Sequence, residues 1–456
     1  MRRLARFAIH STVPAAARDR ARRAFVDTVG VMLAGSVEPV ARIVQALASE
    51  EGGRPRCRVA GTGLTTGAGW AAMANGAAAH ALDYDDMCFV SLAHPSAPLV
   101  PATLAAGELA GAAGLGVLDA YVIGFEVEAV LGRVLNPRHY TQGWHCTSTI
   151  GTLGAAAAAA RLLGLRVEQT TCALALAASE ASGLKENFGT MAKPYHAGMA
   201  ARNGVVATLA ARRGLTAAER ALDGPQGFLV AMAAERADLV GAHEDLGRRW
   251  EILESGITVK LYPSCAGTHP ALDALLDLRA RHGLAAEDVE RVTVDVDEVT
   301  PTILIHDRPT TDLEGKFSLH FCAAAALVFG HVGLDTFADA PLRDERVQRL
   351  LRSVTMQVDP EIGRGRPPLT QARVTVRLRD GRQVEARADG ARGYPDRPAG
   401  DAELDRKFTD CATRVLDAAR AAEALATLRA LERLDDVRTL TALLSTARPD
   451  GGTPGE

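Results

Sequence analysis

Lysine is scarce in this chain of 456 residues. Lys and Arg together number 51, but only five of them are lysines. Arginine serves wherever any positive charge suffices, whereas a retained lysine offers a compact point charge or a proton that can leave. The five are Lys185, Lys193, Lys260, Lys316 and Lys407. Three of them lie in unusual segments, GTMAKPYHAG, TVKLYPSCAGTHP and EGKFSLHF, which reflects either chance or chemistry.

Other absences exclude whole classes of function. Aromatic residues make up 4%, so an Ala- and Gly-rich core must gain its packing from closely approaching helices. The seven cysteines are scattered and form no CxxC pair, which argues against a disulfide framework or a zinc knuckle and fits a reducing cytoplasm. The net charge of −4 is dispersed and indicates no nucleic-acid surface. No GxGxxG follows a strand and no P-loop occurs, so no nucleotide cofactor is expected.

Two segments could be mistaken for a targeting peptide or a membrane span, but we expect neither. The start is Arg-rich, but it lacks a continuous apolar region and runs into an amphipathic helix, so we expect a mature N-terminus. The apolar stretch Ala97–Leu118 contains Pro98, Pro101 and Glu108, which favours a buried core helix over a membrane span. The expected location is the cytoplasm.

The first 260 residues predict one helix after another. Apolar residues repeat with helical periodicity over Ala15–Leu33. The Ala-rich stretch Gly151–Leu163 has almost no side chains, so it must pack closely against its neighbours. A third helix is predicted over Pro194–Arg213, and a glycine follows each of the three, as is common beyond helix ends.

The pattern changes after about residue 290. Valines alternate with polar residues over Arg291–Thr300, which is typical of a half-buried strand, and Ser353–Val358 is similar. Two alternating runs in Ala372–Ala388 surround an Asp-Gly pair, which predicts a β-hairpin. Helical periodicity returns from Asp401 to Leu444.

We therefore expect a mainly α fold with an inserted α+β domain. Residues 1–264 and 398–447 would form a large all-helical domain built from both chain ends. Residues 265–397 would form a smaller α+β lid domain, and residues 448–456 a disordered tail. A chain that returns to its first domain would leave a cleft between the two, and clefts of this kind are common ligand sites.

Four segments place an ionisable side chain just before a predicted helix start. His94 precedes a helix that opens near Pro101, and the other three are His145, Lys193 and His269. Helix N-termini carry free N–H groups and a partial positive charge, so they attract anions. If the four starts converge, they form a pocket for a substrate with several carboxylates.

An acidic cluster precedes His94 in the segment HALDYDDMCFVSLAHPSAP. Asp83, Asp85 and Asp86 lie close together there. A carboxylate can hold an imidazole in one tautomer and raise its basicity, which suits general acid–base catalysis near neutral pH. The alternative is structural: the aspartates form turns, while His80 and His94 are core histidines with satisfied hydrogen bonds.

Two further interpretations stay open. Cys265 could be a nucleophile, although no His–Asp partner follows from the sequence. His80 and His94 could bind a metal with the intervening aspartates, although the spacing matches no HExxH-like ligand pattern. We expect neither a metal nor a cofactor.

The same segments resemble the MmgE/PrpD family of 2-methylcitrate dehydratases, cis-aconitate decarboxylases and iminodisuccinate epimerases. The resemblance runs in family order through about residues 4–330. It rests on ARRAFVDTVGVMLAG, HALDYDDMCFVSLAHPSAP, GWHCTSTIGTLGAAAAAARLLGL, GTMAKPYHAGMAARNGVVATLAARRG with LDGPQGF, KLYPSCAGTHPALDA and GKFSLHFCAAAAL. It implies a homodimer and catalysis without an organic cofactor or obligatory metal.

The resemblance also implies site residues. The expected catalytic residues are Asp83, His94, His145, Lys193 and His269, and the expected substrate-binding residues are Lys260, Cys265 and Asp86. In this hypothesis His94, oriented by Asp83, transfers a proton. Lys193 and His269 anchor carboxylates, and His145 is a second proton-transfer group or an anchor.

The expected activity is that of a cofactor-independent lyase. It would act on a di- or tricarboxylate by proton abstraction next to a carboxylate, as in a 2-methylcitrate dehydratase. The alternatives are an iminodisuccinate-type epimerase or isomerase, a cis-aconitate-type decarboxylase, and a catalytically silent member that binds a carboxylate ligand. The segment MCFVSLA before His94 is largely apolar where the decarboxylase branch is more polar, and Phe321 stands where a tyrosine is frequent. Both departures allow a less polar substrate.

Overall fold

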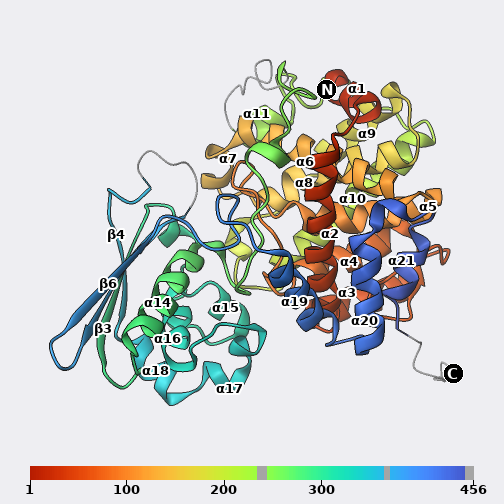
Figure 1. Ribbon diagram of the computed structural model, residues 1–456. Helices are drawn as coiled ribbons and strands as arrows, with labels where there is room; N and C mark the ends of the chain where they lie inside the picture. Colours follow the sequence, from red (N-terminus) through yellow and green to blue (C-terminus); the bar gives the residue numbers. More distant parts are fainter. Residues whose placement is uncertain (234–243, 364–369, 447–456) are drawn as a thin grey trace. The chain divides into compact units, whose positions relative to one another are not determined.

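The computed structural model describes residues 1–233, 244–363 and 370–446 (Figure 1). The chain divides into two compact units: Met1–Glu186 with Ala192–Ile257 and the segment from Gly400 on, and Thr258–Ala399 with Asn187–Met191. The predicted combination of a mainly helical chain with a small sheet is confirmed. The second unit begins before the predicted residue 265, because Val259 N–H donates to the Gly393 carbonyl at 2.9 Å. The predicted tail at 448–456 lies outside the described residues.

The first unit consists of helices from both chain ends. Its longer helices are α1 (Arg2–His10), α2 (Ala15–Gly35), α3 (Pro39–Glu51), α4 (Ala68–His80), α5 (Ser96–Ala110), α6 (Gly114–Leu135), α8 (Cys146–Leu162), α9 (Val167–Glu180), α10 (Ala192–Arg212), α19 (Asp401–Ala412) and α20 (Ala418–Arg429). The short elements are β1 (Cys57–Arg58), β2 (Thr65–Thr66), α7 (Arg138–Thr141), η1 (Lys185–Asn187), α11 (Phe228–Ala233), α13 (Glu251–Glu254), η5 (Leu431–Arg433) and α21 (Arg438–Leu443). In Figure 1 the blue helices α19 and α20 lie beside the red α2, so the two chain ends share one core.

Small residues bring the central helices of this unit together. A Cβ atom on Gly76 of α4 would lie 2.9 Å from the Cα of Gly198 in α10, and a Cβ on Gly198 would lie 2.5 Å from the Met73 carbonyl oxygen. A Cβ on Gly204 would lie 2.5 Å from the Ala155 Cβ of α8. The close packing predicted for the Ala-rich helix is therefore present, and it joins α4, α8 and α10.

Three helices begin earlier than the sequence predicts. The Ala-rich helix starts at Cys146 rather than Gly151, because His145 is its N-cap and its carbonyl accepts from Ser148 and Thr149. The helix predicted near Pro101 starts at Ser96 and continues through that proline. α10 starts at Ala192, so Lys193 lies within its first turn rather than ahead of it.

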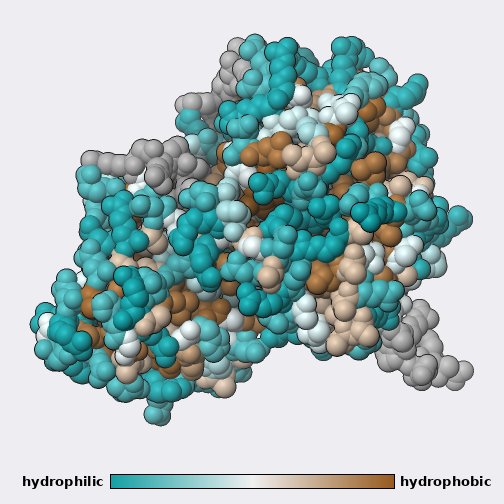
Figure 2. Space-filling model, viewed as in Figure 1, coloured by the Kyte–Doolittle hydropathy of each residue, from teal (hydrophilic) through white to brown (hydrophobic). Residues whose placement is uncertain are grey.

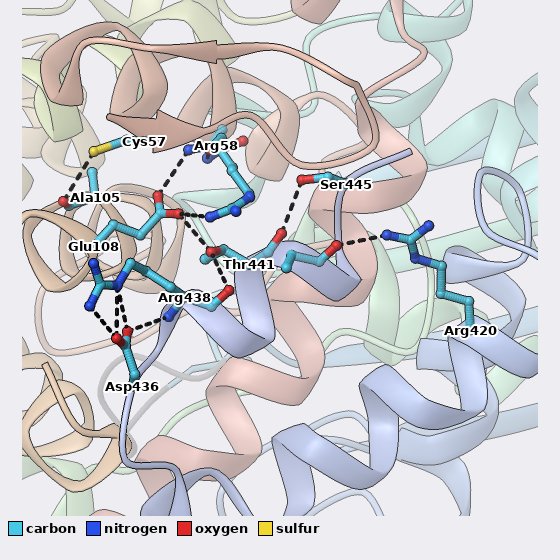
Figure 3. Close-up of polar contacts among 11 residues, drawn as sticks. Cys57, Arg58, Ala105, Glu108, Arg420, Asp436, Arg438, Thr441 and Ser445 are labelled. Carbon is cyan, nitrogen blue, oxygen red and sulfur yellow. Dashed lines mark hydrogen bonds and ion pairs between the residues drawn. The ribbon is translucent and has the colours of Figure 1, made fainter. Parts of the chain in front are cut away.

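A buried carboxylate holds the C-terminal helices in place (Figure 3). Glu108, near the end of α5, accepts hydrogen bonds from the Arg58 backbone N–H at 2.9 Å and from the Thr441 hydroxyl at 2.6 Å. The Arg58 guanidinium adds an ion pair at 3.2 Å. Ser445 donates to the Thr441 carbonyl at 3.0 Å. The last described turn of the chain is thereby fixed to α5, which also begins beside the candidate site.

The second unit packs helices against one face of a four-stranded sheet. Its strands are β3 (Val289–Val296), β4 (Val354–Val358), β5 (Ala372–Leu378) and β6 (Gln383–Ala388), in the order β4-β3-β5-β6. Its helices are η2 (Ala266–Thr268), α14 (His269–His282), η3 (Thr300–Thr302), α15 (Asp312–Lys316), α16 (Leu319–Phe329), η4 (Leu334–Phe337), α17 (Asp339–Leu342) and α18 (Glu345–Leu351). β3 and β4 are parallel, whereas β5 is antiparallel to both β3 and β6. The predicted hairpin is confirmed, and Figure 1 shows α14 and α16 beside the sheet, with α18 packed against α16.

The first strand ends earlier than predicted. The valine alternation suggested Arg291–Thr300, but β3 stops at Val296. The Asp297 carboxylate accepts from the backbone N–H groups of Val299 and Thr300 at 2.9 and 2.8 Å. This side-chain turn competes with the strand ladder and ends it.

The surface and the helix lengths give one further finding. The face in Figure 2 carries mostly hydrophilic residues with smaller hydrophobic groups between them. Among the described residues, no single helix has both the length and the apolar composition needed to cross a membrane. In the part of the chain that the structure describes, one pair of helices meets that criterion when taken together, α2 and α3, which are bent by 85° at their junction.

The α4–α10 crossing can be tested with one added methyl group. We expect Gly198→Ala to lower the free energy of unfolding by about 1–3 kcal/mol, the usual cost of overpacking, since the new Cβ meets backbone. Gly116→Ala in α6 is the control, because nothing lies within 4 Å of its added Cβ. The control should be neutral or slightly stabilising. Thermal melts of both variants measure the difference, and equal stability would show that the crossing tolerates a methyl group.

Candidate active site

The loop between α4 and α5 presents two histidines of the first unit. His80 is the last residue of α4, and His94 lies two residues before Ser96, the first residue of α5. Cys88 and Ala93 exchange backbone hydrogen bonds, which closes a small loop just before His94. Leu92 in that loop has φ 49°, a left-handed conformation that is unusual for leucine. Such strain is typical of segments held in place for function.

A single buried carboxylate lies between the two imidazoles. Asp85 Oδ2 lies 2.8 Å from His80 Nδ1 and 3.3 Å from His94 Nδ1. The rings of His80 and His94 meet edge to face, with centroids 4.6 Å apart. Asp85 is fully buried, whereas 12% of the His94 side chain is exposed. Asp85 therefore faces Nδ1 of both rings and leaves Nε2 of His94 as the nitrogen available to a ligand.

Asp83 forms an ion pair that the sequence did not predict. Its carboxylate forms a buried ion pair with Lys193 Nζ, and its backbone is left-handed with φ 51°. The sequence hypothesis gave Asp83 the task of orienting His94, and the structure also brings Asp85 Oδ2 to 3.3 Å from His94 Nδ1. Lys193 and Asp83 together form a second charged pair beside the histidines.

The third and fourth imidazoles come from two helix starts. His145 is the N-cap of α8 and is 1% exposed, while His196 lies near the start of α10 and is partly exposed. Their Nδ1 atoms are 3.2 Å apart, a hydrogen-bonding distance. The His145 ring also stacks on that of His80, with centroids 5.7 Å apart. Four histidines, two aspartates and one lysine thus gather within the first unit.

Burial and neighbouring charges set the protonation of this cluster. Burial alone would raise the pKa of Asp85, but the imidazoles of His80 and His94 hold it well below its usual range. Burial lowers the pKa of His80, although Asp85 opposes the shift. Burial and then the Lys193 ammonium lower the pKa of His145 well below its usual range. Burial, followed by the charges of His80 and Lys193, lowers the pKa of His196 to about 4.

The cluster can both move protons and attract anions. Asp85 beside His94 is an arrangement for general acid–base catalysis, and Lys193 supplies a fixed positive charge near two helix N-termini. The donor atoms that could hold a metal ion come from His80, Asp83, Asp85 and His94, and they lie within 4.8 Å of one another. One of these four residues, Asp83, already pairs with the Lys193 ammonium.

Asp86 has the surroundings of a structural residue. Its two oxygens accept hydrogen bonds from the Ser96 backbone N–H, at 3.2 Å, and from the Ser96 hydroxyl, and that hydroxyl also contacts Tyr121 Oη at 2.6 Å. Asp86 therefore fixes the start of α5, which explains why that helix begins so early. Because Ser96 donates hydrogen bonds to both carboxylate oxygens, this arrangement argues against the predicted contact of Asp86 with a substrate. Burial, with Asp27 next in importance, raises the pKa of Asp86 to about 8.

A lysine that is distant in the sequence, Lys407, stabilises the acidic segment. Lys407 of α19 is buried, and its Nζ lies 2.6 Å from Asp27 Oδ1 of α2. The same Nζ donates to the Tyr84 carbonyl at 2.7 Å and lies 3.9 Å from the centroid of the Tyr84 ring. Tyr84 stands between Asp83 and Asp85, so this lysine holds the backbone that aims both carboxylates. We had given Lys407 no role.

The remaining predicted residues lie in the second unit, around the segment YPSCAGTH. Lys260 is fully buried there, and His269 is the first residue of α14 with Nε2 3.1 Å from the Ser264 carbonyl. Cys265 is partly exposed and its backbone N–H donates to the Lys316 carbonyl at 3.0 Å. Their participation in one pocket with His94 stays a prediction.

Lys316 acquires a structural role within this segment. Its ammonium donates to the Pro263 carbonyl at 3.1 Å and lies 4.5 Å from the centroid of the Phe337 ring. Its own carbonyl accepts from Cys265, so both ends of the residue fix the same loop. Phe321 packs 5.6 Å from Phe337, centroid to centroid, and is fully buried.

Sequence reasoning missed His196 altogether. It named His80 and Asp85 in the acidic segment but did not include them among the expected site residues, because no local pattern favours Asp85 over Asp83 as a partner of His94. His196 follows Lys193 by less than one helical turn, so the spacing within KPYH was the signal that could have placed it in the site.

Comparisons with known proteins cover nearly the whole chain. The family model described as the MmgE/PrpD N-terminal domain matches residues 2–238, and that of the MmgE/PrpD C-terminal domain matches residues 262–433. A cis-aconitate decarboxylase-like protein of Aspergillus oryzae is 29% identical, over 95% of this chain and 94% of its own length. The cis-aconitate decarboxylases of Mus musculus and Homo sapiens are each 28% identical, over 93% and 94% of this chain and 88% and 90% of their own lengths.

The role of Lys407 can be tested against a matched lysine. Lys407→Met leaves Asp27 buried without its ammonium, so we expect a loss of about 3–5 kcal/mol in the free energy of unfolding. Lys185→Met is the control, because Lys185 also lies over a tyrosine ring, Tyr140, but is partly exposed. Its loss should be about 0.5–1 kcal/mol. Denaturant melts of both variants decide the matter, and equal losses would contradict the buried-pair role.

Asp86 should make stability depend on pH. A carboxyl whose pKa rises to about 8 on folding binds its proton more tightly in the folded state, so its contribution is complete below about pH 4 and is lost as the pH rises towards 8. Asp86→Asn keeps polar groups facing Ser96 but does not titrate. The melting temperature of this variant relative to the parent should therefore rise steadily between pH 5 and 8. A difference independent of pH would show that Asp86 is ionised in the folded protein.

Proposed function

The chain belongs to the MmgE/PrpD family, and on this premise we propose that it is a lyase that acts on a polycarboxylate by moving a proton at a carbon next to a carboxylate. The observation that carries the proposal is the Asp85–His94 pair, with the Lys193 ammonium in the same cluster. The first supplies the proton-transfer group, and the second supplies the charge that an anionic substrate needs.

The Asp85–His94 contact determines what His94 does. A carboxylate at Nδ1 keeps the proton of a neutral imidazole on that nitrogen, so Nε2 is the acceptor. When Nε2 takes a proton, the resulting imidazolium faces the Asp85 anion and is stabilised by it. His94 can then return the proton from the same atom. Asp85 is thus a positioning residue, and His94 is the catalytic base or acid.

Fixed positive charge would stabilise the negative charge that develops on the substrate. Removing a proton or a carboxylate group leaves an electron pair on carbon, and that pair is delocalised towards a neighbouring carboxylate. Lys193 and the N-termini of α8 and α10 are fixed before the reaction begins, so they stabilise the developing charge without reorganising. Lys193 remains our proposed carboxylate anchor, and its ion pair with Asp83 holds the ammonium in position.

Decarboxylation of a cis-aconitate-like substrate is our first choice of reaction. The relatives named above are described as cis-aconitate decarboxylases or as like them, with coverage of at least 88% on both sides. In that chemistry the bond to a carboxylate breaks, carbon dioxide leaves, and the remaining electron pair is protonated on carbon. One proton is consumed per turnover, so the site must hold a proton donor.

Dehydration, our first expectation, becomes the second candidate. There a base takes a proton from carbon, the pair forms a double bond, and hydroxide leaves with a proton from an acid. The observation that favours it is the apolar segment between Asp86 and His94, where the decarboxylase branch is more polar. Epimerisation uses the same proton abstraction without a leaving group.

Residues of the second unit complete the proposal. We propose that Lys260 and His269 bind the remote carboxylates of the substrate and that Cys265 lies near them, as the family resemblance implies. The homodimer implied by the same resemblance is part of the proposal, and light scattering tests it. No residue of the second unit is assigned a proton-transfer step.

A substrate panel in deuterated buffer tests the reaction. Proton NMR with cis-aconitate should show loss of carbon dioxide and a single deuterium on the product carbon. A conjugated alkene from citrate or 2-methylcitrate would instead select dehydration, and exchange of an α-proton without net reaction would select epimerisation. No turnover and no exchange with any carboxylate would contradict the proposal and leave the silent binding member.

Variants of the charged pairs test the assignment. His94→Ala should lower kcat about 10²–10⁴-fold, the usual contribution of a positioned acid–base group. Asp85→Asn should lower kcat more than it raises KM, because it disturbs the tautomer rather than substrate binding. The exposed His282 provides the control, since His282→Ala should change neither constant. Unchanged turnover in both His94→Ala and Lys193→Ala, with folding preserved, would overturn the assignment.

A further inference from the structure

The His145–His196 contact constrains the protons of both rings. Their Nδ1 atoms lie 3.2 Å apart, and a hydrogen bond at that distance needs one donor and one acceptor. One ring therefore carries its proton on Nδ1, and the other presents a lone pair there. The tautomer of His145 is consequently set by His196, and two arrangements are possible.

Backbone contacts hold the two rings together. The Ser148 hydroxyl donates to the His196 carbonyl at 3.2 Å, and the His145 N–H donates to the Gly183 carbonyl at 3.0 Å. Gly183 has φ 124°, and a Cβ there would lie 2.8 Å from the Ser148 Cβ and 3.4 Å from the His196 ring. Only glycine lets this loop pack against the pair. The contact is therefore built into the fold rather than made by two free side chains.

The surroundings keep both rings neutral. His145 stands at the N-terminal end of α8, where the partial positive charge of the helix disfavours a cation. Lys193 lies in the first turn of α10, and its ammonium disfavours protonation of both His145 and His196. Two neutral imidazoles leave only the choice between tautomers, because neither ring carries a second proton.

The burial of His145 and the charge of the proposed substrate together favour one of the two tautomers. If His196 donates from Nδ1, its Nε2 lone pair lies on a partly exposed ring that water can reach, and His145 keeps its proton on Nε2. In the opposite arrangement the deeply buried His145 would present an Nε2 lone pair. A carboxylate substrate repels a lone pair and accepts from an N–H group, so the first arrangement suits it better.

We propose that His196 is a positioning residue that locks His145 in its Nε2–H tautomer, which makes His145 a neutral hydrogen-bond donor to a substrate carboxylate or to the charge that develops on it. This role and the choice of tautomer rest on the proposed function, whereas the hydrogen bond between His145 and His196 does not. It separates His145 from His94: His94 exchanges a proton with the substrate, and His145 stabilises charge without gaining one.

Two nearly isosteric variants of His196 test the direction of the hydrogen bond. His196→Asn keeps a donor close to the position of Nδ1, so kcat should stay within about threefold of the parent. His196→Asp offers only an acceptor there, which forces the His145 proton onto Nδ1, and kcat should fall about 10²-fold or more. Tyr195→Asn and Tyr195→Asp, at the exposed neighbouring position, control for the added charge and should differ little from each other.

A measurement that needs no substrate keeps the inference falsifiable. Nitrogen-15 NMR of histidine-labelled enzyme distinguishes a protonated ring nitrogen from a lone pair, and the His145 signals are those lost in His145→Gln. We expect a proton on Nε2 of His145 and on Nδ1 of His196. A proton on Nδ1 of His145, or a His196→Asp enzyme as active as His196→Asn, would overturn the assignment. If no carboxylate is turned over but the tautomer is as expected, the proposed function fails and the positioning contact stands.

Discussion

The glycine crossing of α4 and α10 is the constraint on which the cluster depends. With Gly76 against Gly198, the two backbones touch, and no side chain separates them. About one turn further along α4 lies His80, and a little over one turn back along α10 lies Lys193. A wider crossing would move the Lys193 ammonium away from His80, on whose pKa it acts. Small residues in the core are therefore what brings the ionisable groups together.

Three buried lysines likewise make compact polar contacts that fix the surrounding structure. Lys193 pairs with Asp83, Lys407 pairs with Asp27, and Lys316 donates to the Pro263 carbonyl. In each case a compact ammonium fits a narrow space beside one or two oxygens, where a planar guanidinium would need a wider opening. Breaking a buried ion pair by removing one partner is costly, so these contacts also fix the backbone around them. The scarcity of lysine in the chain therefore marks structural positions as well as the proposed site.

The sequence predicted local structure better than it predicted partners. The β-hairpin and the Ala-rich helix follow from alternation and composition, which act over a few neighbouring residues. The contact of Asp85 with His94 did not follow, because Asp83 and Asp85 are similar carboxylates only two residues apart, and only the fold distinguishes the contact of Asp85 with His94 from that of Asp83 with Lys193. The contact of Lys407 with Tyr84 spans 323 positions, and no local pattern records it. The early start of α5 likewise depends on a side-chain contact across the loop, from Asp86 to Ser96.

The four histidines are tuned to different tasks by their neighbours. His80 and His94 share the anion of Asp85, which fixes both through Nδ1 and stabilises positive charge where a proton arrives. His145 and His196 have each other at Nδ1, with a helix N-terminus and the Lys193 ammonium nearby, so positive charge on them is disfavoured. Pairs of titratable groups whose environments differ in this way divide acid–base work from charge stabilisation. In the proposed mechanism, one carboxylate beside His94 is therefore what distinguishes the function of His94 from that of His145.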